Sequence, residues 1–141
     1  MKRFHVHVHV DDLARNVEFY AKLFGTPPTR RELDYAKWML DDPGVHFAIS
    51  TGSGQLGVDH LGIQSDSPDE LDLLKRRAAG AGLKLADVGD TTCCYARTDR
   101  FWMSVRQGVE WESFRDLARI DGTTCRILCM PPDSGRRGAL T

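Results

Sequence analysis

Residues 4–10 alternate between apolar side chains and histidines without a break. Successive side chains of a β-strand point to opposite faces, so a strand here has one apolar face and one face made of His5, His7 and His9. The apolar face can pack against other elements, whereas a face of histidines suits the wall of a cavity. We therefore expect a first strand that is packed on one side and polar on the other, and this restricts the fold more than any other segment.

A helix and two strands are expected next. Asp12 is a favoured N-cap residue, and apolar residues at helical spacing predict a helix over residues 13–24. Gly25, with two prolines close behind it, ends this helix. Residues 35–40 and 45–50 then predict two short strands joined by a tight turn.

The same order of elements then recurs. Residues 57–65 predict a strand that contains His60, and Ser67 followed by proline predicts a capped helix to about residue 81. Further strands are expected over residues 83–89, 101–105 and 110–114, with a loop over residues 90–92. A repeat of strand, helix and strands predicts two similar modules packed about a pseudo-twofold centre.

One domain should contain both modules. The expected domain covers residues 1–115, with the first module at about residues 3–50 and the second at about residues 57–115. A chain of 141 residues is long enough to bury one such core without disulfides. Residues 116–141 are more polar and are expected to form an irregular C-terminal tail.

Composition excludes several kinds of partner. The formal net charge is −1, so a cationic surface for nucleic acid is not expected. No apolar run reaches the ~20 residues of a membrane span, and no signal peptide is expected at the N-terminus. Four cysteines are too few for a disulfide scaffold in a chain of this length. We therefore expect a cytoplasmic protein with free thiols and no membrane partner.

Cys93 and Cys94 form an adjacent thiol pair. Thiolates are soft ligands that suit thiophilic metals and metalloids. Neighbours in a strand point to opposite faces, so both thiols reach one atom only where the backbone leaves strand geometry. The alternative is a pair of buried, apolar cysteines. Cys125 and Cys129 would share one face of a helical turn, and they either add a further thiolate or metal clip to the site or are adventitious tail cysteines.

Three segments, in this order, resemble the vicinal oxygen chelate superfamily, which includes glyoxalase I, extradiol dioxygenases and the bleomycin- and fosfomycin-resistance proteins. They are His5-Val6-His7-Val8-His9-Val10-Asp11-Asp12-Leu13 with Val17-Glu18-Phe19-Tyr20, then Asp59-His60-Leu61-Gly62, then Glu110-Trp111-Glu112-Ser113-Phe114. The resemblance implies an α+β fold in which two βαβββ modules form a pseudo-twofold curved sheet around a metal site. Dimerisation is common in the superfamily, so the resemblance also implies a homodimer.

A narrower resemblance concerns the thiol pair. Thr91-Thr92-Cys93-Cys94-Tyr95-Ala96 and Asp99-Arg100-Phe101-Trp102 are similar to the branch that contains organoarsenical carbon–arsenic lyases and cadmium-induced proteins. That branch often has glutamine where this chain has His5. Histidine is usual at this position in the dioxygenases of the superfamily, so the departure keeps a metal ligand.

The resemblance implies a metal site made of His5, His60 and Glu112, which would also be the catalytic residues. Two imidazoles and one carboxylate on one face of an octahedral Fe(II) leave three positions for O2 and substrate. Ni²⁺, Mn²⁺ and Zn²⁺ are the alternative metals. His7 is then a cavity-lining residue that binds substrate, and His9 a residue of the rim. Without the resemblance, each histidine would more simply be a satisfied or exposed side chain.

The first hypothesis is an enzyme for heavy-metal and arsenic resistance. Cys93 and Cys94 would hold a trivalent organoarsenical, such as methylarsenite or an aryl arsenical, while Fe(II)- and O2-dependent chemistry cleaves its carbon–arsenic bond to give arsenite. The second hypothesis is a binding protein that sequesters cadmium or arsenite without turnover. The third is a metal-dependent lyase or thiol transferase of the glyoxalase type, in which the cysteine pair has no role.

Overall fold

The computed structural model describes residues 1–52, 54–93, 95–105 and 107–119, and of Cys93 it describes the backbone. The predictions for Cys94, Cys125 and Cys129 therefore lie outside the described residues. Within the described part, no helix is long and apolar enough to cross a membrane.

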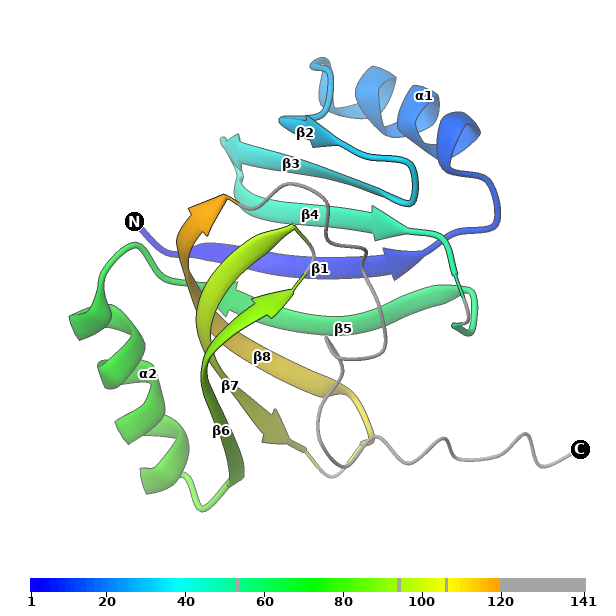
Figure 1. Cartoon of the computed structure of the whole chain (residues 1–141). Helices are drawn as coiled ribbons and strands as arrows, with labels where there is room; N and C mark the ends of the chain where they lie inside the picture. The colour runs from blue at the N-terminus through cyan, green and yellow to red at the C-terminus, as the bar shows by residue number, and fades with distance from the viewer. Residues whose placement is uncertain (53, 94, 106, 120–141) are drawn as a thin grey trace, which may run out of the picture.

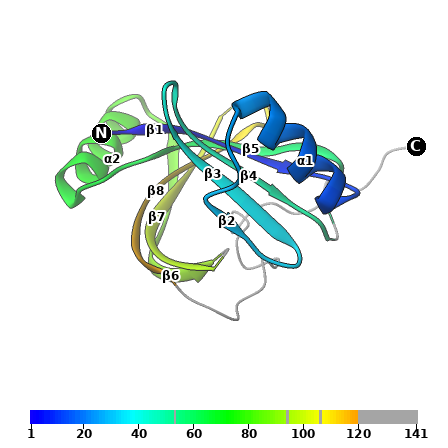
Figure 2. The same ribbon diagram turned by 90° about the horizontal axis from the view of Figure 1, so that it is seen from above.

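Eight strands of the described residues form one curved sheet in the order β2-β3-β4-β1-β5-β8-β7-β6 (Figure 1). The strands are β1 (Arg3–His9), β2 (Arg30–Arg31), β3 (Tyr35–Asp41), β4 (Gly44–Ser50), β5 (Gly57–Gln64), β6 (Lys84–Cys93), β7 (Ala96–Ser104) and β8 (Glu110–Arg119). The helices are α1 (Leu13–Phe24) and α2 (Pro68–Gly80). Seen from above, the sheet curls around an open side while both helices cover its outer face (Figure 2).

Two βαβββ modules meet at the centre of this sheet. β1 pairs with β4 in parallel and β5 pairs with β8 in parallel, and β1 and β5 join the modules as an antiparallel pair. The strand order is therefore symmetric about the β1–β5 junction. This confirms the α+β class and the curved, two-module sheet that the sequence predicted.

The helices begin and end where their capping residues predict. The side chain of Asp12 accepts a hydrogen bond from the backbone N–H of Arg15, and Gly25 closes α1 with a φ of 71°. Ser67 caps α2 by accepting from the backbone N–H of Glu70. An apolar cluster, which includes Val17, Trp38 and Ile49, lies between α1 and the sheet. The packed cores thus lie under the helices, which leaves the inner face of the sheet for polar side chains.

Strands β6 and β7 are longer than the sequence predicted. Residues 90–92 were expected to form a loop, but they pair with β7 as part of β6. A bulge between Asp87 and Gly89, where Gly89 has a φ of 66°, lets the strand continue past the glycine. Glycine and aspartate have poor strand propensity, and pairing with β7 overrides it here. The loop prediction was wrong because Gly89 forms a bulge within the strand and does not end it.

Two further differences concern the ends of the modules. β8 continues to Arg119 and pairs with β7 as far as Ala96, whereas the last strand was expected to end at Phe114. The two-residue strand β2 was not expected, and it pairs with β3 at Lys37 and Ala36. Residues 116–119 are therefore strand and not irregular tail.

Candidate metal centre

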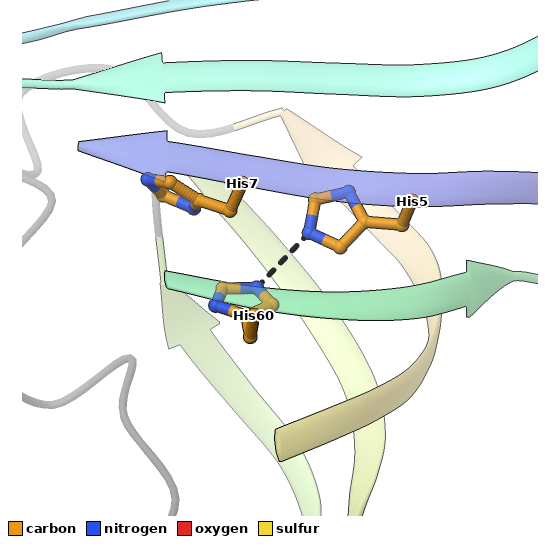
Figure 3. A group of neighbouring side chains, drawn as sticks. All are labelled: His5, His7 and His60. Atoms are coloured by element: carbon orange, nitrogen blue, oxygen red, sulfur yellow. Dashed lines mark hydrogen bonds between the residues drawn. The ribbon is translucent and has the colours of Figure 1, made fainter. Parts of the chain in front are cut away.

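All five histidines of the chain gather in one region of the inner face. Three stand on β1, His46 stands opposite His5 on β4, and His60 stands opposite His7 on β5. His5 and His7 project from β1 toward His60 (Figure 3). β1 and β5 lie at the centre of the sheet, so the junction of the two modules brings these side chains together.

His5, His60 and Glu112 bring one donor atom each to a common point. The Nε2 atoms of His5 and His60 are 3.0 Å apart, and Glu112 Oε2 lies 3.6 Å from the first and 3.2 Å from the second. Adjacent ligands on an octahedral ion with bonds of about 2.1 Å lie about 3.0 Å apart. The three residues are at most 4% exposed. The separations therefore suit three ligands on one face of a metal ion.

The outer nitrogens of both imidazoles are already occupied. His60 Nδ1 lies 2.7 Å from Asp59 Oδ2, and His5 Nδ1 lies 3.0 Å from the backbone oxygen of His46. A carboxylate and a carbonyl accept hydrogen bonds, so both contacts favour the tautomer that carries its proton on Nδ1, and in His5 this nitrogen also faces His46 Nδ1 at 2.7 Å. Each Nε2 then presents a lone pair, and two lone pairs facing each other at 3.0 Å require a cation or a proton between them. The donor set thus fits a metal ion.

Arg100 holds the other oxygen of the Glu112 carboxylate. Arg100 Nη1 lies 2.8 Å from Glu112 Oε1, and both side chains are buried. Arg100 Nε in turn donates to Thr98 Oγ1 at 2.9 Å, which fixes the guanidinium. The carboxylate is therefore turned so that Oε2, and not Oε1, faces the imidazoles.

The pKa values of Glu112, His60 and His5 are shifted in ways that decide which of them is charged. Burial alone would raise the pKa of Glu112, but Arg100 and His60 outweigh it and lower that pKa to about 2. Burial alone would lower the pKa of His60, but hydrogen bonds with Asp59 and Glu112 raise it to about 9. Burial and the neighbouring His60 lower the pKa of His5 to about 3. Without a metal, the cluster therefore holds its proton on His60 and keeps Glu112 as a carboxylate.

His7 offers a second way to complete the cluster. Nitrogen atoms of His5, His7 and His60 all lie within 4.8 Å of one another (Figure 3). His7 Nε2 is 2.7 Å from Ser50 Oγ, and burial lowers the pKa of His7 well below its usual value. A neutral His7 can thus serve either as a ligand or as a wall of the cavity, and the assignment of ligands stays a prediction.

The cluster lies in a pocket with an empty volume of about 390 Å³, open mouth included. Its lining comes from both modules: His5, His7, Tyr35, Lys37, His46, His60, Ala96, Thr98, Arg100, Glu112, Phe114 and Asp116. Lys37 Nζ lies 3.7 Å from Asp116 Oδ2 at this inner face, and burial raises the pKa of Asp116. The pocket is therefore polar, with both signs of charge on its wall.

The remaining predicted residues are placed as follows. Cys93 ends β6 and pairs with Ala96, which lines the pocket. Tyr95, two residues after Cys93, has a φ of 64° and so lies outside strand geometry. Whether both thiols reach one atom stays a prediction, as do the roles of the tail cysteines. His9 is half-buried beside Ser50, with its Nδ1 at 3.1 Å from Ser50 Oγ.

Several lining residues were not expected from the sequence. They are Tyr35, Lys37, His46, Thr98, Arg100, Phe114 and Asp116. His46 stands in a strand that the sequence predicted, but nothing in the sequence pairs that strand with the one that carries His5. Arg100 belongs to a segment that carried the family resemblance, but nothing in its spacing pairs it with Glu112. Both contacts depend on which strands are neighbours in the sheet.

Comparison with known sequences identifies the family. The family model described as "Glyoxalase/Bleomycin resistance protein/Dioxygenase superfamily" matches residues 2–116. The chain is 43% identical over 124 residues to the trivalent organoarsenical cleaving enzyme of Bacillus sp. (strain MD1), covering 86% of this chain and 77% of that protein. It is 36% identical over 141 residues to the probable trivalent organoarsenical cleaving enzyme of Bacillus subtilis (strain 168), covering 95% and 94%. It is also 32% identical over 119 residues to the cadmium-induced protein CadI of Mycobacterium tuberculosis (strain ATCC 25618 / H37Rv), covering 84% and 78%.

Solved structures share the fold at low sequence identity. An extradiol ring-cleaving dioxygenase from B. fuscum superposes with a TM-score of 0.60 at 13% identity, covering 83% of this chain and 33% of that one. The Mn(II)-bound glyoxalase from Novosphingobium aromaticivorans superposes with a TM-score of 0.59 at 19% identity, covering 90% and 44%. The family model and the relatives described above confirm the expected resemblance, including its arsenical and cadmium branch. The chain belongs to the glyoxalase/bleomycin resistance protein/dioxygenase superfamily.

Proposed function

We propose that this protein cleaves the carbon–arsenic bond of trivalent organoarsenicals, such as methylarsenite or aryl arsenicals, in an Fe(II)- and O2-dependent reaction that releases arsenite. Relatives named for cleavage of trivalent organoarsenicals, at 43% and 36% identity, support this reaction class. The likeness of the fold to dioxygenases supports a metal-dependent oxidation.

One observation carries the proposal. The converging donor atoms of His5, His60 and Glu112 lie in the same pocket that Ala96 lines, and Ala96 pairs with Cys93 at the end of β6. Imidazole and carboxylate suit a first-row metal such as iron, whereas thiolates suit arsenic. A site of this kind can hold a soft substrate centre and a harder metal side by side.

Different residues would bind the arsenical and the metal. The thiols of Cys93 and Cys94 would displace two hydroxyl groups of the arsenical, forming two sulfur–arsenic bonds and releasing two waters. A disulfide cannot make this exchange, so both cysteines must be reduced, and each gives up its proton because the thiolate is the better ligand. His5, His60 and Glu112 would hold Fe(II), which when bound supplies the redox chemistry and open positions for O2 and substrate. Asp59 and Arg100 keep the ligands turned toward it through their contacts at 2.7 and 2.8 Å.

The direct test is release of arsenite. Metal-free protein is loaded with Fe(II) without oxygen, then given air and methylarsenite, and the arsenic species are separated and quantified. We expect arsenite from the Fe(II)-loaded protein and none from the metal-free protein or from the double variant Cys93→Ala/Cys94→Ala. Tight, cysteine-dependent binding of methylarsenite with no arsenite formed would contradict the proposal.

The relative named as a cadmium-induced protein, at 32% identity, favours a second candidate. In this alternative, the cysteines sequester cadmium or arsenite and no bond is cleaved. Cysteine-dependent binding without turnover in the same experiment would favour it. A glyoxalase-type reaction gives the cysteine pair no role. Loss of methylarsenite cleavage in Cys93→Ala/Cys94→Ala would therefore contradict this third hypothesis.

A further inference from the structure

His46 is a buried imidazole of the pocket to which the proposed function gives no part. It stands on β4, opposite His5 of β1 in the parallel strand pair, and it is 4% exposed. Its Nδ1 lies 2.7 Å from His5 Nδ1, and its backbone oxygen lies 3.0 Å from the same nitrogen. His46 thus meets the outer nitrogen of His5 with both its side chain and its main chain.

These contacts favour one arrangement of the protons in the pair. A carbonyl oxygen only accepts hydrogen bonds, so the contact with the His46 backbone favours a proton on His5 Nδ1. A neutral imidazole carries one N–H, which leaves a lone pair on His5 Nε2, the nitrogen that faces His60 and Glu112. Two imidazole nitrogens at 2.7 Å need one proton between them, so His46 Nδ1 accepts and the proton of His46 sits on its Nε2.

Phe114 holds the two imidazole rings from another side. Its ring centre lies 5.0 Å from that of His5 and 5.4 Å from that of His46, and both contacts are edge to face. The centres of the two imidazole rings are 4.6 Å apart. Packing therefore fixes where the His5 ring lies, and its hydrogen bond with His46 fixes which nitrogen is turned toward His60 (Figure 3).

The acceptors behind the two imidazoles of the cluster differ in charge. His60 Nδ1 faces the Asp59 carboxylate at 2.7 Å, whereas His5 Nδ1 faces an imidazole nitrogen and a carbonyl oxygen. A hydrogen bond to a charged acceptor is roughly twice as strong as one between neutral groups. His5 is therefore held less firmly than His60, and loss of one of its two acceptors should affect it measurably.

We propose that His46 is a positioning residue that acts through His5: its Nδ1 accepts the proton of His5 Nδ1 and so keeps the lone pair of His5 Nε2 turned toward the metal site. The inference rests on the proposed function, because it takes His5 as a metal ligand. It gives β4 a part in a centre whose donor atoms come from β1, β5 and β8.

The first measurement locates the protons in the metal-free full chain. Proton–nitrogen NMR correlation spectra of the imidazole rings distinguish a nitrogen that carries a proton from one that carries a lone pair. We expect the proton on Nδ1 in His5 and on Nε2 in His46, with His5→Gln and His46→Gln to assign the signals. A proton on His46 Nδ1 and a lone pair on His5 Nδ1 would overturn the inference.

The second measurement is the affinity of the full chain for Co(II), used as a spectroscopic probe of the metal site. His46→Phe removes the imidazole acceptor and keeps a ring, whereas the side-chain carbonyl of His46→Gln can accept again. Loss of the partner behind a ligating histidine typically lowers metal affinity by about 10–100-fold. We expect a loss of about tenfold in His46→Phe, since the backbone oxygen remains as an acceptor, and recovery of most of that loss in His46→Gln.

The proton NMR spectrum of the Co(II)-loaded protein separates positioning from general loosening. The N–H of an imidazole bound to Co(II) gives a strongly shifted signal that exchanges with water. We expect two such signals in the wild type, from His5 and His60, and selective broadening of the His5 signal in His46→Phe. Ile49→Val is the matched control, because Ile49 stands on the same strand but packs in the core under α1. It should lower stability and change neither signal.

The outcomes separate this inference from the proposed function. Unchanged Co(II) affinity with an intact His5 signal in His46→Phe overturns the inference and leaves the proposed function standing. Equal broadening of both signals, or the same changes in Ile49→Val, also overturns it. A wild type that binds Co(II) without shifted imidazole signals contradicts the metal centre itself, and the proposed function fails with it. If His46→Phe does not fold, the proton positions in the wild type and the Co(II) affinity of His46→Gln still decide.

Discussion

At the scale of single residues, the Glu112 carboxylate lies between Arg100 and the two imidazoles of His5 and His60. One carboxylate oxygen contacts Arg100 at 2.8 Å and the other faces the two imidazoles. Because Glu112, Arg100 and both imidazoles are buried, Arg100 both offsets the charge of Glu112 and fixes its direction. Removing Arg100 would leave a buried carboxylate without its nearest counter-charge.

We therefore predict that Arg100→Gln lowers the free energy of unfolding of the metal-free protein by about 3 kcal/mol, the low end of the cost of breaking a buried ion pair. Urea unfolding measures this. The double variant Arg100→Gln/Glu112→Gln should lose less than the sum of the two single variants, because neither charge is then left alone. Additive losses would show that the pair does not contribute as a unit.

The sequence could predict only part of this site. His5, His60 and Glu112 followed from the order of three motifs, and the structure brings their donor atoms together. Arg100 and His46 did not follow, because their contacts depend on pairing between strands that are distant in the chain. A single sequence shows the period of each strand but not its neighbours or its register.

At the scale of elements, strands β5 and β8 come close together where Gly62 pairs with Glu112. A Cβ atom built on Gly62 would lie 2.3 Å from the backbone oxygen of Glu112. No real side chain tolerates such a distance to a backbone atom, so β8 would have to move. The glycine thus keeps the strand that carries Glu112 against the strand that carries His60.

We predict that Gly62→Ala destabilises the protein by about 1–3 kcal/mol, as overpacking does, and weakens metal binding because Glu112 shifts away from His60. Thermal unfolding and metal titration measure the two effects. Gly80→Ala is the matched control, since a Cβ there meets no atom within 4 Å and the position lies in α2. Equal effects of the two substitutions would mean that the close approach at Gly62 has no consequence.

The elements themselves were predicted unevenly. α1 was predicted with its observed bounds, because Asp12 and Gly25 mark its ends by local hydrogen bonds and backbone conformation. The extensions of β6 and β7 were missed, because Gly89 looks like a strand end in the sequence and becomes a bulge only when β7 pairs beside it. Local signals thus located the helices, and strand length depended on pairing.

At the scale of the whole molecule, the two modules meet on buried histidines, which makes stability depend on pH. Burial, and like charge nearby, lower the pKa of His5 to about 3 and those of His7 and His46 well below the usual value. Below pH 6.5 these histidines bind protons in the unfolded chain but stay neutral in the folded protein. The free energy of unfolding therefore falls as the pH falls. His60, with a pKa of about 9, stabilises the fold below pH 6.5, and that contribution is lost as pH rises toward 9.

We predict that the metal-free protein is most stable near pH 6.5–7 and that its free energy of unfolding falls by at least about 1.4 kcal/mol per pH unit from pH 6.5 to 5.5, the value for one proton. Urea midpoints measured between pH 5 and 9 in the presence of a chelator give this curve. His46→Phe should reduce the acid slope by removing one buried imidazole. A midpoint that stays constant from pH 7 to 5 would contradict the prediction.

The proposed function assigns binding of the arsenical to one part of the pocket and its cleavage to another part. Glu112→Ala separates the two most directly, and Glu110→Ala, two residues earlier on β8, is the matched control. In Fe(II)-loaded protein under air, Glu112→Ala should release no arsenite from methylarsenite, while its affinity for methylarsenite stays that of the wild type and Glu110→Ala keeps its turnover. Arsenite release by Glu112→Ala at the wild-type rate would mean that Glu112 is not a ligand that cleavage requires.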